Sequence, residues 1–417
     1  MNDLRWRHFT MIAALCLLAL CFIACSDSRQ ASTASKQGAS AANGESIHII
    51  MSNVAENFSS IYQKIGRGAN LSAQDQQAIA EDIANLRKYF KRADEIFEHK
   101  TDAYQIGYAF VTRYLKLSAD LLKQGDQDAL RTHLYALREI CSTCHTQDKN
   151  LRSLYQGAQS TQFKSLFQYA EFNYSTRNYE TAVKYYELDL QRNKNLTEID
   201  IIQPLQRILS VYLQVYDDPD KALQIIRKYQ TLKAHTDLTR DELKGWIGGL
   251  TYLKARKKSL KQPLDKEQLT QLVREFFGAV RNINLSSQSN AREEVQRLWL
   301  RGRLYEFLNS NPPRQQVPEL LYWLSVVDQS TSYNYYFSYA DLYLSQCVRK
   351  YADLPYAKYC FSEYEKYIYD TYLKEARLRD PMARYPEDIE EEYQELKEIM
   401  SKTKISQNKI NQSLSSK

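Results

Sequence analysis

Two cysteines and a histidine stand together in the stretch Cys141-Ser142-Thr143-Cys144-His145. Two thiols one helical turn apart can each add to a vinyl group of a porphyrin, and the adjacent imidazole can then bind the iron. The pattern C-x-x-C-H is typical of such attachment. A thioredoxin-like redox pair would need a βαβ setting, and a zinc site would need a second Cys/His pair nearby; the sequence provides neither. We therefore expect one covalently bound haem c.

Four amphipathic helices lead up to this motif and include it. Apolar residues recur at spacings of three and four, the period of a helix that buries one face. The predicted helices are residues 46–64, a helix starting at Ser72 with Asp75 as its capping partner, residues 102–123, and a fourth through Leu130, Leu134 and Leu137. The apolar face of the fourth helix continues into Cys141 and Cys144, so we expect the haem inside the bundle.

The region 46–157, with four helices and C-x-x-C-H near the end of the last one, resembles the class II c-type cytochromes, the cytochrome c-prime group. The resemblance implies a four-helix-bundle cytochrome domain. In it Cys141 and Cys144 would be the thioether anchors and His145 the proximal iron ligand. Members of this group either leave the distal iron face to an apolar side chain or ligate it with a methionine from the first helix.

Met51 is the candidate for that distal ligand, because it lies on the apolar stripe of the first helix near the position of the family ligand. The alternative is core packing, since methionine fills irregular gaps in bundles. His48 is a competing ligand that we expect at the edge of the stripe. The basic residue that the family places after the haem histidine, where it would neutralise a propionate, would be Lys149 or Arg152.

Residues 1–24 have the layout of a signal peptide, with a cationic start and an apolar stretch too short to span a bilayer. The sequence Phe22-Ile23-Ala24-Cys25 resembles a bacterial lipobox, apart from Phe22 in place of the usual leucine. The resemblance implies lipidation of Cys25 and a periplasmic protein tethered to a membrane. Ser26 after it indicates the outer membrane by the same analogy. The alternative is an ordinary cleaved signal peptide; residues 25–45 have the composition of a flexible tether.

Helix pairs without a catalytic signature are expected over residues 158–403. The pattern of large, small and aromatic positions resembles tetratricopeptide repeats in two copies, formed by Leu166, Tyr169, Ala170, Ala182 and Tyr186 and by Leu209, Ser210, Leu213, Ala222, Ile226 and Tyr229. Later copies are degenerate, so we expect a tetratricopeptide-like α-solenoid and not a regular array. Stacked repeats commonly hold a partner protein in a groove, and the alternative is a passive spacer.

Two further cysteines, Cys347 and Cys360, flank a predicted turn at similar heights on two antiparallel helices. A disulfide between them is feasible in an oxidising compartment, and two buried thiols are the alternative. A charged helix at 387–402 would cap the solenoid, followed by a disordered tail at 404–417.

The composition agrees with an all-α chain of 417 residues, since 12 Gly and 9 Pro are too few for the many tight turns of sheet-rich folds. A net charge of +6, spread evenly, gives no footprint for nucleic acid. The 32 tyrosines are interpreted mainly as packing material of the repeat helices.

These observations predict a membrane-tethered mono-haem cytochrome for electron transfer, whose repeat domain docks a redox partner or an envelope complex. One alternative is a gas-binding or redox-sensing haem protein with an open distal face. Another is an assembly lipoprotein with a structural haem. We do not expect an enzyme, because the sequence has no catalytic triad and a single haem motif.

Overall fold

The structure is a computed structural model that describes residues 46–65, 71–97, 101–146, 158–193, 196–230, 236–278, 290–331 and 338–415. These ranges contain helices and no strand, which confirms the all-α prediction for them. The residues from Ile47 to Lys417 form one compact unit. The predicted signal peptide, Cys25 and the tether lie outside the described residues. None of the described helices combines the length and the apolar character needed to span a membrane.

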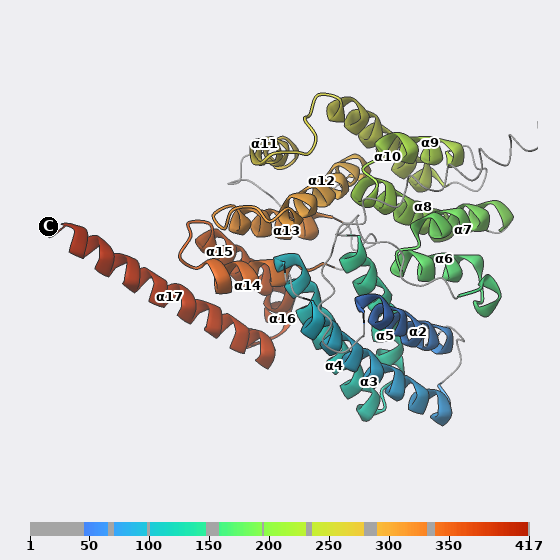
Figure 1. Cartoon of the computed structure of the whole chain (residues 1–417), viewed down its shortest axis with the longest axis horizontal. Coiled ribbons are helices and arrows are strands. Elements are labelled where there is room, and N and C mark those ends of the chain that lie inside the picture. The colour runs from blue at the N-terminus through green and yellow to red at the C-terminus, as the bar shows by residue number, and fades with distance from the viewer. Residues whose placement is uncertain are drawn as a thin grey trace, which may run out of the picture. The chain divides into compact units, whose positions relative to one another are not determined.

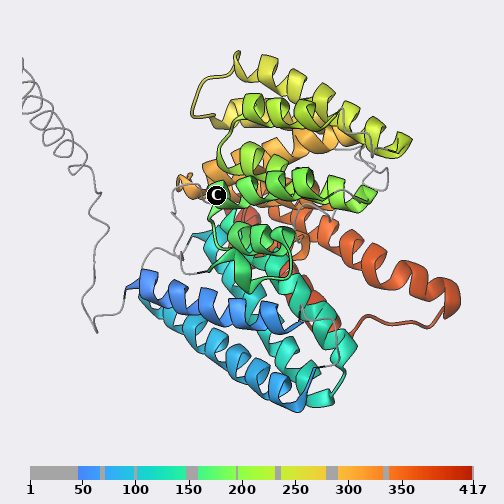
Figure 2. The same cartoon turned by 90° about the vertical axis from the view of Figure 1, so that its right-hand side faces the viewer.

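Four helices make up the N-terminal helix group: α2 (Ile47–Ile65), α3 (Ala73–Ile96), α4 (Asp102–Gln124) and α5 (Gln127–His145). The local sequence explains where they begin and end. Ser72 and Asp75 form the expected capping box at the start of α3, and Thr101 caps α4. Gly125, with φ of 75°, ends α4 in the left-handed conformation that glycine adopts without steric cost. In this group α2 packs on α3, α3 on α4, α4 on α5 and α5 on α2 (Figure 2).

The remaining helices form the C-terminal helix array, which stacks beside the first group (Figure 1). Its elements are the short 3-10 turn η1 (Ser160–Gln162), α6 (Leu166–Ser175), α7 (Tyr179–Arg192), α8 (Glu198–Ser210), the π-helix η2 (Val211–Val215), α9 (Pro219–Tyr229), α10 (Asp237–Lys257), α11 (Lys266–Phe277), α12 (Ala291–Asn309), α13 (Val317–Ser330), α14 (Ala340–Tyr351), α15 (Ala357–Ile368), the π-helix η4 (Tyr369–Leu373), α16 (Lys374–Arg379) and α17 (Glu387–Ser415). Neighbours in the chain pack on one another, as α6 on α7 and α13 on α14.

Two glycines allow helices of the array to approach closely. A Cβ at Gly249 of α10 would lie 2.8 Å from the carbonyl oxygen of Arg292. A Cβ at Gly302 of α12 would lie 2.8 Å from the Cα of Gln214 in η2. Any larger residue at these positions would therefore push the backbones apart.

The cysteines of α14 and α15 are joined. The sulfur atoms of Cys347 and Cys360 are 2.10 Å apart, the Cα atoms are 6.3 Å apart, and both side chains are fully buried. The bond links two helices that also pack on each other through apolar residues.

The last helix, α17, contacts α14 and α15. Arg349 of α14 makes ion pairs with Glu392 at 2.8 Å and Glu395 at 2.9 Å. The helix continues to Ser415, past residue 404 at which the sequence predicted a disordered tail. The segment from residue 404 to residue 415 contains no glycine or proline to end the helix.

The N-terminal helix group and the array contact each other directly, within the single unit. Asp102, the first residue of α4, accepts hydrogen bonds from Lys350 Nζ and Tyr351 Oη, each at 2.7 Å. Arg113 of α4 lies 3.3 Å from Asp341 of α14. The array therefore packs against the helices that carry and support the cysteine motif.

Candidate functional site

The last turn of α5 carries Cys141, Cys144 and His145. Asp126 caps the start of this helix, since its side chain accepts from the N–H of Ala129 at 3.0 Å. The apolar face of the helix is buried in the group's core. The two cysteines are three residues apart, so they lie on neighbouring positions of one helix face. Cys141 packs against the core as the apolar pattern of α5 predicts.

Cys144 lies against a glycine of the preceding helix. A Cβ at Gly107 of α4 would be 3.2 Å from the Cys144 sulfur. Such a contact is tighter than ordinary van der Waals packing, so Gly107 leaves space that this sulfur needs. The fit between α4 and α5 at the motif thus depends on one small residue.

The thiol of Cys141 sits where a thiolate is disfavoured. Burial, with a further contribution from the neighbouring Cys144, raises the pKa of Cys141 to about 12. The motif is also at the carboxyl end of α5, where the helix dipole disfavours negative charge. Thioredoxin-like cysteines have the opposite environment, at a helix N-terminus that lowers the thiol pKa. The surroundings therefore argue against a dithiol redox site.

His145 is oriented by a residue of the array. Its Nδ1 atom is hydrogen-bonded to the backbone carbonyl of Ser175, the last residue of α6. A carbonyl only accepts, so Nδ1 carries the proton and the lone pair is on Nε2. Burial, together with the nearby positive charge of Arg177, lowers the pKa of His145 to about 3, against the opposing effect of the Ser175 hydrogen bond. The imidazole is therefore neutral at neutral pH, with Nε2 free to bind a metal.

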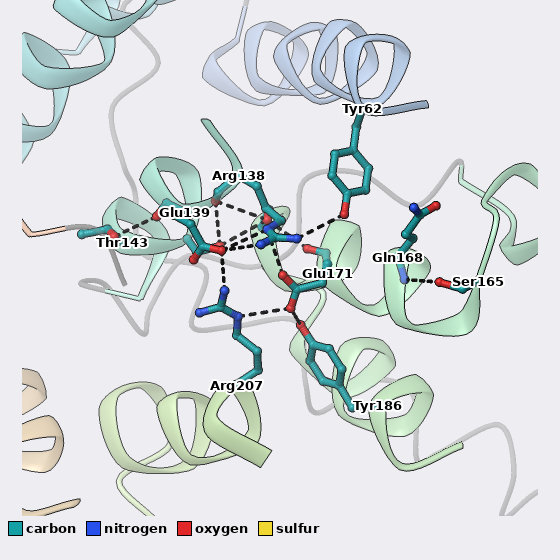
Figure 3. A network of polar contacts seen from close by, with 11 residues as sticks. Tyr62, Arg138, Glu139, Thr143, Ser165, Gln168, Glu171, Tyr186 and Arg207 are labelled. Carbon is teal, nitrogen blue, oxygen red and sulfur yellow. Dashed lines mark hydrogen bonds and ion pairs between the residues drawn. The ribbon is translucent and has the colours of Figure 1, made fainter. Parts of the chain in front are cut away.

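A buried ionic network, here called the Glu171 network, holds α5 against the array (Figure 3). Its charged members are Arg138 and Glu139 of α5, Glu171 of α6 and Arg207 of α8. Arg138 Nε is 2.9 Å from one carboxylate oxygen of Glu171, and Arg207 Nε donates to the other at 3.1 Å. Arg207 also contacts Glu139, and the hydroxyl of Tyr186 donates to Glu171.

The charges in this network compensate one another. Glu171 is completely buried and Arg207 almost so. Burial raises the pKa of Glu171, but Arg138 and Arg207 outweigh that effect and lower its pKa overall. Arg138 further donates to the hydroxyl of Tyr62 in α2 at 3.3 Å, so the network joins both parts of the unit. Its two members on α5, Arg138 and Glu139, are three and two residues before Cys141 on the same helix.

A second link reaches α5 from the beginning of α14. The hydroxyl of Tyr339 donates to the carbonyl of Ile140 at 3.2 Å, and its ring lies 4.8 Å from that of Phe110. The backbone N–H of Tyr339 donates to Asp328 at 2.9 Å. Asp328 is paired with Arg301 at 2.9 Å, and both side chains are fully buried. A residue directly before Cys141 is thus held by a chain of contacts from α12 and α13.

Sequence reasoning missed these two networks. The motif itself indicated only the thiols and the imidazole, whereas Glu171 and Asp328 are single acidic residues among apolar ones. A carboxylate inside an apolar helix face is a signal of a buried ion pair, but its partners come from distant helices. The hydrogen bond from His145 to Ser175 had no sequence signal, because any residue has a carbonyl.

Of the other predicted site residues, two lie on α2 and three lie outside the described residues. Met51 is half-buried on α2 and packs against the core, while His48 is exposed. Cys25, Lys149 and Arg152 lie outside the described residues, so their predicted roles stay predictions. Iron ligation by Met51 also stays a prediction.

A cavity of about 430 Å³ lies along α7 and η2. Its lining includes Glu180 and Glu187 of α7 and Tyr212 and Tyr216 at η2. Tyr216 is partly exposed, and Glu187 is also paired with Lys228. The cavity therefore combines acidic and aromatic groups on the face of the first helix pair of the array.

The site as a whole combines two thiols on one helix turn, a neutral imidazole whose Nε2 carries the lone pair and a buried ionic network that fixes the helix carrying them. These groups can attach and ligate a cofactor but contain no activated nucleophile. In comparisons with known proteins, no protein-family model, no curated protein and no solved structure matches the chain.

Proposed function

We propose that this chain is a lipid-anchored, mono-haem c-type cytochrome that transfers electrons, with the C-terminal helix array docking a protein partner. The observation that carries the proposal is the environment of the C-x-x-C-H motif. Its two thiols are on one helix turn, and its histidine is neutral with Nε2 unprotonated. This donor set fits a covalently attached haem, because attachment uses two thiols and ligation uses a neutral imidazole.

The chain's own residues would prepare the site as follows. Cys141 and Cys144 would hold the group on α5, and His145 Nε2 would be the proximal ligand. The Ser175 carbonyl fixes the tautomer and the ring orientation of His145, which is the usual task of the second partner of a ligating histidine. When bound, the haem would supply exchange of one electron between ferric and ferrous iron.

The arrangement of helices supports the class II assignment of the N-terminal group. Four consecutive helices contact in a closed order, and the motif is at the end of the fourth. The α6–α7 pair supports a tetratricopeptide-like solenoid, because Ala170 and Ala182 are completely buried in these two closely packed helices. The cavity along α7 is the surface on which we place the partner protein.

Location in the periplasm, with Cys25 lipidated and anchored in the outer membrane, is part of the same proposal. The disulfide between Cys347 and Cys360 supports it, since such bonds persist in oxidising compartments.

The first test is covalent haem in the exported full-length chain. Produced in a bacterium with a cytochrome c maturation system, the wild-type chain should keep haem after denaturation and give a haem-sized increase in mass. Cys141→Ala combined with Cys144→Ala should lose all of it, because no thioether can form. Ser142→Ala is the control within the motif and should keep the haem. Export of the wild-type chain without bound haem would contradict the proposal.

The second test concerns the distal face and separates electron transfer from gas binding. With Met51 as ligand, the ferric protein should show a weak near-infrared Met-to-iron band, and Met51→Ala should convert it to a high-spin spectrum. A high-spin, five-coordinate spectrum in the wild-type chain would favour the open distal site of a gas-binding or redox-sensing protein. His48→Ala tests the competing ligand at an exposed position of the same helix; with Met51 as ligand it should leave the band unchanged.

A further inference from the structure

The corner between α6 and α7 lies next to the histidine of the motif. Ser175, whose carbonyl accepts from His145, ends α6, and Tyr179 begins α7. Between them Arg177 has a φ of 66°, in the left-handed region that residues other than glycine, asparagine and aspartate rarely adopt. Such conformations persist where the surrounding structure imposes them and are frequent at functional sites.

Two nitrogen atoms of the Arg177 guanidinium group have no hydrogen-bond partner among the described residues. Its Nε and Nη1 atoms are both buried and unbonded. Arg177 is two residues after Ser175, whose carbonyl accepts from His145, so the guanidinium belongs to the segment that contacts this imidazole. A buried cationic donor without a partner is costly, so the group is suited to an anion that the polypeptide does not supply.

Tyr179 provides a second donor at the same corner. Its side chain is only 5% exposed, and its hydroxyl is buried without a hydrogen-bond partner. Tyr179 is also in electrostatic range of both Arg177 and Cys144. A guanidinium fork and a hydroxyl together match the two oxygens of a carboxylate.

We propose that Arg177 and Tyr179 form a carboxylate-binding corner that holds a propionate of the haem. The inference rests on the proposed function, and it extends the site from the N-terminal helix group into the array. The α6–α7 corner then has two tasks: Ser175 orients the proximal histidine, and Arg177 with Tyr179 binds the acidic edge of the same group.

The test uses the full-length, haem-loaded chain and two readouts, the resonance Raman bands of the propionates and the reduction potential. Arg177→Gln should shift the propionate bands and lower the potential, because a buried positive charge favours the reduced, less positive iron site. Arg177→Lys should keep the reduction potential close to the wild-type value, because the positive charge remains. Tyr179→Phe should shift the propionate bands without changing the charge at the corner. Arg192→Gln is the matched control: it removes the same charge from an exposed position of α7, 13 residues from Tyr179 or about 20 Å along the helix.

Arg177→Gly separates binding from folding. Glycine adopts the left-handed conformation freely, so the melting temperature of this variant should equal or exceed that of Arg192→Gln while its propionate bands still shift. Wild-type bands and potential in Arg177→Gln, Arg177→Gly and Tyr179→Phe, with haem covalently attached, would overturn the inference. Absence of covalent haem from the wild-type chain would instead overturn the proposed function.

Discussion

Glu171→Ala should lower the free energy of unfolding by about 3 to 5 kcal/mol, the usual effect of removing one partner from a buried ionic group. The carboxylate is completely buried between Arg138 and Arg207, at 2.9 and 3.1 Å from their Nε atoms. Without it, the Nε atom of Arg207 loses its carboxylate partner, and the hydroxyl of Tyr186 loses its acceptor. The measurement is urea unfolding of the full chain, followed by far-ultraviolet circular dichroism.

Two further variants test whether the loss of stability comes from the buried charge of Glu171. Glu171→Gln keeps the shape and an acceptor oxygen but removes the charge, so its effect should be large but smaller than that of alanine. Glu180→Ala, at an exposed position of α7, should change the free energy of unfolding by no more than about 0.5 kcal/mol. Equal effects of Glu171→Ala and Glu180→Ala would show that the network does not hold α5 against the array.

The same carboxyl should make stability depend on pH. Its pKa in the folded chain is lowered, because the attraction of Arg138 and Arg207 exceeds the effect of burial, while an unfolded glutamate titrates near about 4.3. The folded state then binds fewer protons than the unfolded state between these two values. Its contribution is complete above the unfolded pKa and is lost as the pH falls through the folded pKa. Glu171→Gln should therefore show a shallower loss of stability below about pH 4.3 than the wild-type chain.

The sequence allowed prediction of local structure in the N-terminal helix group, because local groups determine it. The capping box at Ser72 and Asp75 and the left-handed Gly125 both act within four residues of their helix ends. The apolar period of α5 also indicated that Cys141 faces inward, as it does. These features depend on residues that are close together in the sequence.

The parts of the site that escaped prediction depend on contacts between distant residues. Glu171 and Arg207 are separated by 36 residues from each other and meet α5 only after α6 and α8 have packed. The Ser175 carbonyl that orients His145 and the guanidinium of Arg177, with its two buried, unbonded nitrogen atoms, belong to a segment that the sequence assigned to a separate repeat domain. Periodicity places a residue on a helix face but does not identify the helix that will cover it.

The contacts around Cys141 also bear on how a docked partner could influence the proposed haem site. Arg138 and Glu139 connect α5 to α6 and α8, and Tyr339 connects it to α14. Tyr179 packs edge-on against Tyr216, a residue of the cavity along α7, with ring centroids 6.3 Å apart. The surface proposed for docking and the helix proposed for haem attachment therefore belong to one packed structure.

Asp328→Ala should destabilise the chain by about 3 to 5 kcal/mol and also loosen the turn that carries Cys141. Asp328 is the buried partner of Arg301 at 2.9 Å and the acceptor for the N–H of Tyr339 at 2.9 Å. Its loss removes this carboxylate from the buried guanidinium of Arg301, which still donates to Gln214 at 2.6 Å. It also releases Tyr339, whose hydroxyl donates to Ile140 one residue before Cys141.

Urea unfolding and hydrogen exchange at the amides of α5 together test this coupling. Asp328→Ala should exchange faster in the last turn of α5 than the wild-type chain, because opening there no longer has to break the contact with Tyr339. Asp370→Ala, which removes an exposed i,i+4 partner of Lys374, is the control and should cost less than about 1 kcal/mol without changing exchange in α5. Unchanged exchange in α5, in an Asp328→Ala chain that is destabilised as expected, would mean that the array stabilises the fold without holding α5. Faster exchange confined to α13, α14 and the last turn of α5 would place the Arg301–Asp328 pair among the contacts that position Cys141.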